Sequence, residues 1–493
     1  MIEKVLGKRG RSILVSSVCT FTTLEGGQMS SKLRGWKLLL PLAALLAVGG
    51  SLAGASFASS SAAVVKVAIM TDCKGAFGFG YELDIGGAQA AFAKLAGGKT
   101  KNKNKPSAGM TGIKVGSTPV NIVGYGCGDD TAATGAKETR RLMEQLKADV
   151  MIGPLSGDEA VVVANYAKTH LDKTFIIGTA GSQDPTMQIA PKNLFRYHGD
   201  GAQWNAGVGE IAYKKLGWRK AAIIIDDYSF GWTSGAGMIA DFCAVGGNIT
   251  KRVFPPLNTT DYSSFVRQLP RPGQVDGYFS AVGGTGTSAM LKAFEQAYGK
   301  LDPNEWIGNL FFGFLGADKV VAPKLVGAWI GGFGTAPGLK TAQAVAYRKA
   351  FNSVYPKLPA DDGFVYNYYN AAAGLVGGLQ KSGGAVGAKL QASMPRQLKT
   401  GFAVSNGGFV KLDSRRQGIT DQYQLILVRN ADGSIGPQVA AYVPGVDQSF
   451  GGLFKPTSPP PGRTQPPCVK VKTPWQGKVQ VIDNGVITKT FIK

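Results

Sequence analysis

Histidine, acidic residues and long apolar runs are scarce in this chain, and each shortage excludes a class of protein. Only two histidines, His170 and His198, occur in 493 residues, and there is no Cys-x-x-Cys pair or His/Cys cluster. A zinc site or other metal site is therefore not expected. After residue 58 no stretch of 18 apolar residues remains, so no transmembrane helix is expected there. A Walker A loop and a long-period repeat are also missing, which argues against an NTPase and a solenoid.

Acidic residues are outnumbered by basic ones: 54 Lys and Arg against 32 Asp and Glu give a net charge of +22. Such a charge can attract nucleic acid or an anionic surface. The basic side chains are dispersed, however, and the one dense run, Lys99 to Lys105, has no interleaved aromatic residue. We therefore expect no nucleic-acid partner. Hydrophobic residues make up 44% of the chain, enough for two or three packed units.

Residues 1–58 have the composition of a leader. Three basic residues precede an apolar stretch from Leu38 to about Val48, and small residues follow, which is the pattern of a secretory signal peptide. Because Met29 directly precedes the basic part, we interpret 1–28 as an upstream extension and 29–58 as the signal peptide. No cysteine follows at a lipoprotein-like position, so the expected location is periplasmic or extracellular, without a lipid anchor.

Four cysteines follow the leader, and they allow three pairings: Cys73, Cys127, Cys243 and Cys468. Cys73 and Cys127 each end a predicted strand, so their side chains meet if those strands are parallel neighbours. This favours a Cys73–Cys127 bridge, and Cys243–Cys468 then follows by elimination. Disulfides suit an exported protein, and four unpaired thiols are the alternative.

Short β-branched runs alternate with amphipathic segments of helical length, which predicts an α/β protein with parallel sheets covered by helices. The first series comprises strands at 64–70, 120–125, 149–153 and 174–178, with helices at 81–95, 130–147 and 157–169. The second comprises helices at 203–216, 233–245, 262–269 and 287–298, with strands at 220–226, 248–254, 275–282, 309–313 and 328–332.

The two series predict two α/β lobes, divided near residues 182–193. Two helices without a strand between them, at 342–355 and 364–380, suggest that the chain then returns to the first lobe. Antiparallel strands at 408–412 and 422–428, closed by a turn at 430–433, then belong to the second. The predicted division is 59–182 with 335–403 for lobe 1, and 183–334 with 404–454 for lobe 2. Residues 455–493 form a Pro-rich linker and a tail hairpin around Asn484-Gly485.

Ligands of open parallel sheets bind beyond the carboxyl ends of the strands, so the loops there are the candidate site. In the first lobe these loops are rich in glycine and hydroxyl groups: Asp72–Gly80, Gly153–Glu159 and Thr179–Ser182. Ser156 and Glu159 have the spacing of a capping box. Alternatively, the same loop leaves backbone N–H groups free to hold a carboxylate at the helix N-terminus. The second lobe offers Asp226–Trp232 and Gly283–Thr287.

No catalytic constellation can be built from the sequence. The GPLSG segment is not a GxSxG elbow, and the sequence position of neither histidine indicates a catalytic triad with Ser156. The adjacent carboxylates Asp226 and Asp227 normally diverge in a loop. The glycines of residues 75–80 run in the reverse order of GxGxxG, so a dinucleotide is not expected. We expect neither an enzyme nor a cofactor.

Several segments resemble a known family. IGPLSGDEAVVVANYAK, FIIGTAGSQDPT, the YSFG loop and YFSAVGGTGT, in this order and spacing, are similar to the leucine/isoleucine/valine-binding family of ABC-importer substrate-binding proteins. The resemblance covers about residues 64–450. It implies the type I periplasmic binding fold: two Rossmann-like lobes with parallel central sheets, joined by a three-stranded hinge. The hinge crossings would fall near 182–193, 333–338 and 401–408.

The resemblance also implies a ligand site between the lobes. Ser156 and Gly157 resemble the pair that binds the ligand carboxylate. The other positions that match the family's site are Phe77, Phe79 or Tyr81, then Thr179, Ala180 and Ser182, then Tyr228 or Phe230, and Gly284 with Thr285. Family members that bind amino acids carry an acidic residue for the ammonium group where this chain has Phe314-Leu315-Gly316. Asp226, Asp227 and Asp318 are the remaining candidates, and a ligand without an ammonium group is nearly as consistent.

The expected function is capture of a small organic ligand, a branched-chain amino acid or a carboxylate, and its delivery to an ABC-importer membrane permease by a monomeric protein. Two alternatives remain open. The protein could be a ligand sensor or cell-surface scaffold without transport, with the tail engaging a partner, or a secreted serine hydrolase that uses Ser156 with a histidine.

Overall fold

The first sheet is built around β1 (Val65–Asp72), whose residues are nearly all buried because helices cover both faces. The computed structural model describes residues 64–284 and 286–493; the predicted leader and Thr285 lie outside the described residues. Strands run in the order β4-β5-β1-β6-β7-β8, and all pairs except β4–β5 are parallel. The other strands are β4 (Lys114–Val115), β5 (Thr118–Gly128), β6 (Val150–Ile152), β7 (Thr174–Ile176) and β8 (Leu194–Phe195).

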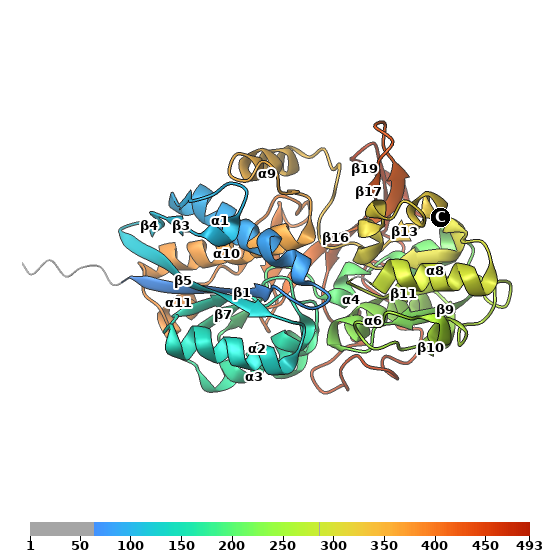
Figure 1. Cartoon of the computed structure of the whole chain (residues 1–493), viewed down its shortest axis with the longest axis horizontal. Helices are drawn as coiled ribbons and strands as arrows, with labels where there is room; N and C mark the ends of the chain where they lie inside the picture. The colour runs from blue at the N-terminus through green and yellow to red at the C-terminus, as the bar shows by residue number, and fades with distance from the viewer. Residues whose placement is uncertain (1–63, 285) are drawn as a thin grey trace, which may run out of the picture. The chain divides into compact units, whose positions relative to one another are not determined.

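Alternate residues of β1 face opposite layers, as the period of two in a strand requires. Val67 and Ile69 pack in one core with α1 (Tyr81–Ala96) and α10 (Gly363–Ser382). Ala68 and Met70 pack in another with α3 (Gly157–Thr169) and with Leu142 and Met143, which follow α2 (Ala132–Arg140). Figure 1 shows these two layers on either side of β1 and β5.

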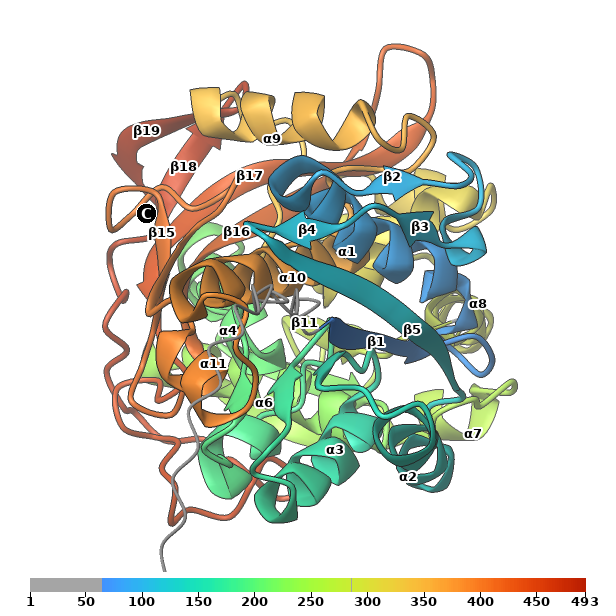
Figure 2. The same cartoon turned by 90° about the vertical axis from the view of Figure 1, so that its left-hand side faces the viewer.

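The second sheet has a parallel half and an antiparallel half. Its order is β10-β9-β11-β12-β13-β16-β17-β18-β19, with the direction reversing between β13 and β16. Figure 2 shows how far the two long strands β16 and β17 extend. The parallel strands are β9 (Lys220–Ile225), β10 (Asn248–Val253), β11 (Gly277–Ala281), β12 (Trp306–Gly308) and β13 (Trp329–Ile330), and the antiparallel ones are β16 (Gly418–Arg429), β17 (Ile435–Val446), β18 (Gln480–Asp483) and β19 (Val486–Phe491).

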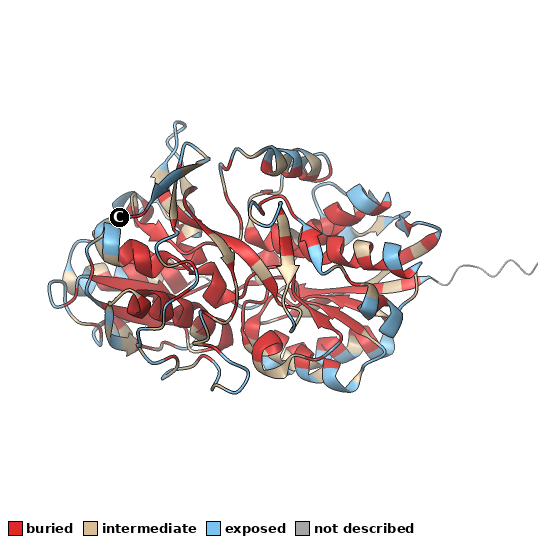
Figure 3. Ribbon diagram, turned by 180° about the vertical axis from the view of Figure 1, so that it is seen from behind, coloured by how far each residue is buried: buried red, intermediate tan, exposed pale blue. Residues whose placement is uncertain are grey.

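Helices cover both faces of the parallel half. On one side α6 (Ser229–Ala244) is buried along almost its whole length, and on the other α8 (Gly286–Tyr298) contributes Met290 and Phe294 to the core. Figure 3 shows buried residues concentrated in the sheets and the inner helices. No helix among the described residues is long and apolar enough to cross a bilayer. These features are those of the type I periplasmic binding fold.

The chain passes between the two sheets three times. The first passage follows β8, which pairs with β7 in the first sheet although it lies beyond the expected crossing at 182–193. The second leads from β13 to α9 (Ala342–Asn352) and the third from β14 (Gln397–Lys399) through β15 (Phe409–Leu412) to β16. Arg196 and Gln417 form a β-bridge between the first and third passages.

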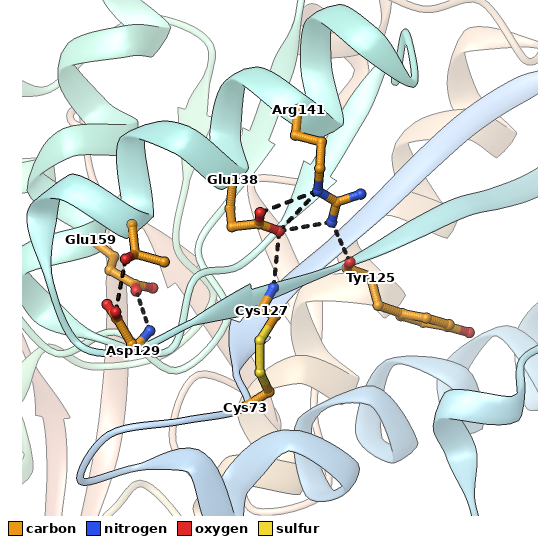
Figure 4. The surroundings of a disulfide bond; sticks show 8 residues. Cys73, Tyr125, Cys127, Asp129, Glu138, Arg141 and Glu159 are labelled. Carbon is orange, nitrogen blue, oxygen red and sulfur yellow. Dashed lines mark hydrogen bonds and ion pairs between the residues drawn. A yellow bond between two sulfur atoms is a disulfide. The ribbon is translucent and has the colours of Figure 1, made fainter.

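The predicted disulfide pairing is confirmed. Cys73 is bonded to Cys127, with 5.0 Å between their Cα atoms, and joins the ends of β1 and β5 (Figure 4). Cys243 at the end of α6 is bonded to Cys468 in the tail, with 5.3 Å between Cα atoms. The tail hairpin β18–β19 is also confirmed, and it extends the second sheet at β17.

Three predicted elements differ from the structure. The helix expected at 203–216 is broken into α4 (Gly201–Trp204), α5 (Val208–Glu210) and a π-helical turn, because Gly207 adopts φ +92°. The strand expected at 309–313 is instead the 3-10 helix η7 (Leu310–Ala317), with the strand β12 just before it. The helix expected at 262–269 shortens to α7 (Ser263–Val266).

Candidate ligand-binding site

A cavity lies where loops at the carboxyl ends of both parallel sheets meet. Its volume is about 20 Å³, room for roughly one water molecule. Among the described residues none of the lining side chains is charged. The lining residues are Phe77, Leu155, Ser156, Gly157, Thr179, Gly181, Trp204, Tyr228, Phe230, Leu310, Phe311, Phe333 and Phe364. We call this the inner cavity.

Aromatic rings from both lobes fill the space around the inner cavity. Phe77 of the first lobe stacks on Phe311 of the second, with 5.5 Å between ring centroids. Trp204 meets Phe333 edge to face at 4.8 Å, and Phe333 meets Phe364 at 5.0 Å. Offset and edge-to-face pairs at these distances are favourable. The rings therefore hold the lobes together and give the cavity apolar walls.

Two helix N-termini from opposite lobes face each other at this cavity. A Cβ atom on Gly157, the first residue of α3, would lie 2.6 Å from Ser229 Oγ, and Ser229 is the first residue of α6. Ser156 Oγ, Ser229 Oγ and the Tyr228 hydroxyl are buried and make no hydrogen bond within the described chain. The backbone N–H groups at two helix ends and three unpartnered hydroxyls therefore converge here. Each helix is long enough for its N-terminus to carry a partial positive charge.

The capping box considered for Ser156 is not formed. Ser156 is the N-cap of α3, but its side chain accepts no hydrogen bond from the helix. Glu159 turns away and accepts a hydrogen bond from the Asp129 N–H at 3.2 Å. A serine that does not cap its own helix keeps its hydroxyl available to another group. The capping interpretation is therefore wrong, and the anion-binding interpretation stays a prediction.

One polar contact and one close approach join the lobes beside the cavity. Asp158 of α3 accepts a hydrogen bond from the Ser229 N–H at 3.1 Å. Gly284, at φ +56°, approaches Ala76 so closely that a Cβ atom there would lie 2.7 Å from the Ala76 Cβ. The absence of a side chain at Gly284 therefore allows the lobes to meet.

Trp204 reaches the cavity because a short helix is fixed at its start. Asp200 Oδ1 accepts the Gln203 N–H at 2.9 Å, and Gln203 Oε1 accepts the Asp200 N–H at 2.9 Å. This reciprocal capping box holds α4 directly after the first passage between the lobes.

The sequence-predicted site residues divide between the cavity and its surroundings. Six of them line it: Phe77, Ser156, Gly157, Thr179, Tyr228 and Phe230. Ala180 and Ser182 are buried just behind the lining, and the Ser182 hydroxyl donates to the Gly157 carbonyl at 3.0 Å. Phe79 is 46% exposed and packs against Phe314 and Phe364 outside the cavity. Tyr81 packs on the core of the first lobe. Thr285 lies outside the described residues.

Four aromatic lining residues were not predicted: Trp204, Phe311, Phe333 and Phe364. Phe311 lies in η7, where a strand was expected, and Phe333 belongs to the second passage between the lobes. Phe364 is in the first turn of α10, far along the chain from the other loops. The sequence did contain a clue: aromatic residues at 311, 312 and 314 do not follow the alternation of buried and exposed side chains expected in a strand.

The three carboxylates considered as ammonium partners are engaged elsewhere. Asp226 Oδ2 accepts the Gly283 N–H at 2.7 Å, and burial raises the pKa of Asp226 well above its usual value. Asp227 is ion-paired with Arg463 of the tail. Asp318 is paired with Lys292 at 2.7 Å. None of them lines the inner cavity, so it presents no carboxylate to an ammonium group.

Three carboxyl groups are buried together behind the first-lobe loops: Asp72, Asp130 and Glu159. Asp130 Oδ2 accepts the Phe77 N–H at 3.3 Å, which ties the group to a cavity residue. Burial raises the pKa of Asp130 to about 6 and that of Glu159 to about 7. Burial, followed by the charges of Glu159 and Asp130, also raises the pKa of Asp72. Figure 4 shows Glu159 beside Asp129, close to the Cys73–Cys127 bridge.

Neither a metal centre nor a serine nucleophile is formed in the part of the chain that the structure describes. No three His, Cys, Asp or Glu side chains there are arranged to hold a metal ion. The His198 Nδ1 atom hydrogen-bonds the Gly199 carbonyl and burial lowers the pKa of His198 to about 3, while His170 Nδ1 contacts the Tyr166 carbonyl. Ser156 therefore has no hydrogen-bonded base, which a serine nucleophile requires.

Comparison with known proteins decides the family. A sequence model of the family described as periplasmic binding protein matches residues 64–431, most of the chain. The chain belongs to the periplasmic binding protein family. The match ends before the tail of this periplasmic binding protein, and the resemblance predicted from its sequence is confirmed.

Solved structures with the same fold include proteins that bind different ligands. A solute-binding protein of an ABC transporter from R. palustris, in complex with benzoate, has 20% identity and a TM-score of 0.64, covering 80% of this chain and 100% of that one. One from Rhodopseudomonas palustris BisB5, in complex with 3,4-dihydroxybenzoic acid, has 18% identity and a TM-score of 0.62, and the match covers 78% of this chain and 98% of that one. A branched-chain amino acid transporter substrate-binding protein from Streptococcus pneumoniae, in complex with isoleucine, has 13% identity and a TM-score of 0.59, and the match covers 76% of this chain and 99% of that one. No curated protein sequence matches the chain.

Proposed function

We propose that this periplasmic binding protein is exported, captures a small aromatic carboxylate between its lobes, and delivers it to the membrane permease of an ABC importer. One observation carries the ligand class: two helix N-termini with three unpartnered hydroxyls meet at a cavity that is lined mostly by aromatic and leucine side chains. An anion suits the helix ends, and a ring suits the walls. The benzoate and dihydroxybenzoate complexes of structural relatives support the same class.

An amino acid is the second candidate, because a substrate-binding protein in complex with isoleucine shares the fold. An α-ammonium group in an apolar cavity needs a carboxylate or several acceptors to replace its hydration. The inner cavity offers no carboxylate from the described residues, which favours a ligand without an ammonium group beside its carboxylate.

Ligand binding requires the lobes to part and the rings to repack. The inner cavity is about 20 Å³, whereas pockets for small molecules commonly enclose ~300 Å³ or more. The aromatic contacts between Phe77, Tyr228 and Phe311 join the two lobes, so separating the lobes exposes the helix ends to solvent. Closure over the ligand then presents a distinct shape to the permease.

Thermal unfolding tests the proposal with protein that has been unfolded and refolded to remove any retained ligand. Benzoate should raise the midpoint, since a ligand at one hundred times its dissociation constant adds about 2.7 kcal/mol. Benzamide, which has the same ring but no negative charge, should act at least tenfold more weakly. Ser156→Ala should weaken the binding of benzoate. Ser264→Ala, which changes an exposed serine of α7, should leave it unchanged. If isoleucine raises the midpoint and benzoate does not, the ligand is an amino acid and the aromatic carboxylate class is wrong.

A further inference from the structure

A second, larger chamber adjoins the inner cavity and shares two of its walls. Leu310 and Phe333 line both spaces. The second chamber has a volume of about 340 Å³, within the size range of small-molecule pockets. It is bounded by η7, by the second passage between the lobes, by the start of α10, and by β16 and β17. We call it the outer chamber.

Apolar and carboxylate groups line the outer chamber. Phe314, Pro337, Pro359 and Pro437 supply apolar surface, and Asp361 and Asp362 supply the charged groups. None of its described lining residues is basic. A ligand group that enters this chamber therefore meets negative charge against an apolar background, the opposite of the helix N-termini in the inner cavity.

The two carboxylates differ in whether a cation already neutralises them. Asp361 is engaged by Arg348, whose Nε atom lies 2.8 Å and 2.9 Å from the two carboxylate oxygens. The same guanidinium also donates to the Leu339 and Ala336 carbonyls, so its position is fixed. Asp362 has no ion-pair partner among the described residues. Its Oδ1 atom accepts only the Phe364 N–H, at 2.8 Å.

Asp362 is also tied to the inner cavity through its own helix. It is the N-cap of α10, and Phe364 in the first turn of that helix lines the inner cavity. Burial raises the pKa of Asp362 to about 7, which shows how poorly its surroundings solvate the ionised form. A cation placed beside it would replace that lost solvation.

We propose that the outer chamber is a second recognition subsite, in which Asp362 binds a primary ammonium group carried by the ligand at the end remote from its carboxylate. The ligand would then be an aromatic acid with a cationic side arm. Its carboxylate lies at the α3 and α6 ends, its ring lies among the aromatic walls, and its arm passes Leu310 and Phe333 to Asp362. This inference rests on the proposed function and adds the position of a positive charge to it.

Calorimetric titration at pH 8, where Asp362 is ionised and a primary amine is protonated, tests the subsite. The probes are benzoate and two matched pairs: 4-(aminomethyl)benzoate with 4-(hydroxymethyl)benzoate, and the corresponding aminoethyl and hydroxyethyl compounds. In at least one pair the amine should bind tenfold or more tightly than the alcohol, which corresponds to about 1.4 kcal/mol. Asp362→Asn should abolish that ratio while leaving benzoate affinity within twofold.

Asp261→Asn is the matched control. Asp261 also accepts the N–H two residues along at the start of a helix, from Ser263 at 2.9 Å, but it is exposed and distant in sequence from the chamber. Because the asparagine oxygen can accept the same backbone N–H bond, both variants should fold. Benzoate binding without a preference for either amine, or a preference that persists in Asp362→Asn, would overturn the subsite alone. Failure of every aromatic acid to bind would overturn the proposed function with it.

Discussion

Single buried carboxyl groups make the stability of this protein depend on pH. Glu159 has an ordinary pKa of 4.5, and burial raises it to about 7 in the folded state. Between these two values the folded protein holds a proton that the unfolded chain has released. The free energy of unfolding contributed by this group is therefore greatest below about pH 4.5 and falls as the pH rises towards 7.

Glu159→Gln should remove this contribution, because an amide does not ionise and still accepts the Asp129 N–H. Relative to the unsubstituted protein, the variant should gain about 1–3 kcal/mol in unfolding free energy between pH 5 and pH 8. Urea unfolding at both pH values measures it. Asp172→Asn, a change at an exposed carboxylate, should keep the same difference at both values. Parallel pH profiles for Glu159→Gln and the unsubstituted protein would contradict the assignment.

Individual site residues were predictable where sheet topology alone locates them. Ser156, Gly157 and Thr179 follow buried strands, and parallel strands bring their carboxyl ends to one edge. Phe333 and Phe364 could not be found in this way, because they reach the cavity only through the return of the chain between lobes. Asp362 was missed for the same reason: in sequence it is an ordinary helix N-cap.

Elements of the tail are integrated into the second lobe. Trp475, 1% exposed, donates from Nε1 to Asp241 Oδ1 at 2.8 Å and meets Phe450 edge to face at 4.8 Å. The segment from Cys468 to β19 is therefore held by a disulfide, a buried ring and strand pairing, although it lies beyond the region matched by the family.

Trp475→Ala should destabilise the protein by about 3–5 kcal/mol, since it leaves a large cavity and removes the donor to Asp241. Chemical unfolding measures the loss, and limited proteolysis should locate new cleavage between 455 and 480. Val486→Ala, at a position in β19 that is 57% exposed, should change stability by no more than about 0.5 kcal/mol. Equal effects of the two substitutions would show that the tail is not anchored through Trp475.

Most helices and strands followed from hydrophobic periodicity, and the failures have local causes. The helix α3 matches its prediction at both ends, because its apolar face and N-cap are unambiguous. The segment 203–216 has the same periodicity, yet the backbone at Gly207 stops the helix. In η7, the run LFFGFLGA is apolar enough for a strand, but Phe311 turns towards the space between the lobes whereas the next residue, Phe312, packs in the core of the second lobe.

Closure of the two lobes depends on the close contact between Gly284 of one lobe and Ala76 of the other. At Gly284 a methyl group would meet Ala76 of the opposite lobe, so only the closed arrangement is affected by added bulk. Gly284→Ala should therefore weaken benzoate binding about tenfold or more while the lobes themselves stay folded. Isothermal titration measures the affinity.

Gly433→Ala separates the backbone effect from the closure effect. Gly433 has φ +81° in the β16–β17 turn, and no atom lies within 4 Å of an added Cβ. Both alanines should lower the unfolding free energy by up to about 1 kcal/mol, because each adopts a left-handed backbone conformation. If Gly433→Ala weakens benzoate binding as much as Gly284→Ala does, contact between the lobes is not the cause of the lost affinity.

Trp204 gives the molecule an optical reporter of its own state. Its indole ring is 1% exposed, stacks with His198, and has an Nε1–H that donates to no group of the described chain. None of the other described tryptophans lines the inner cavity. Indole emission depends on the polarity around the ring, so parting of the lobes and seating of a ligand each change the light that this one side chain emits.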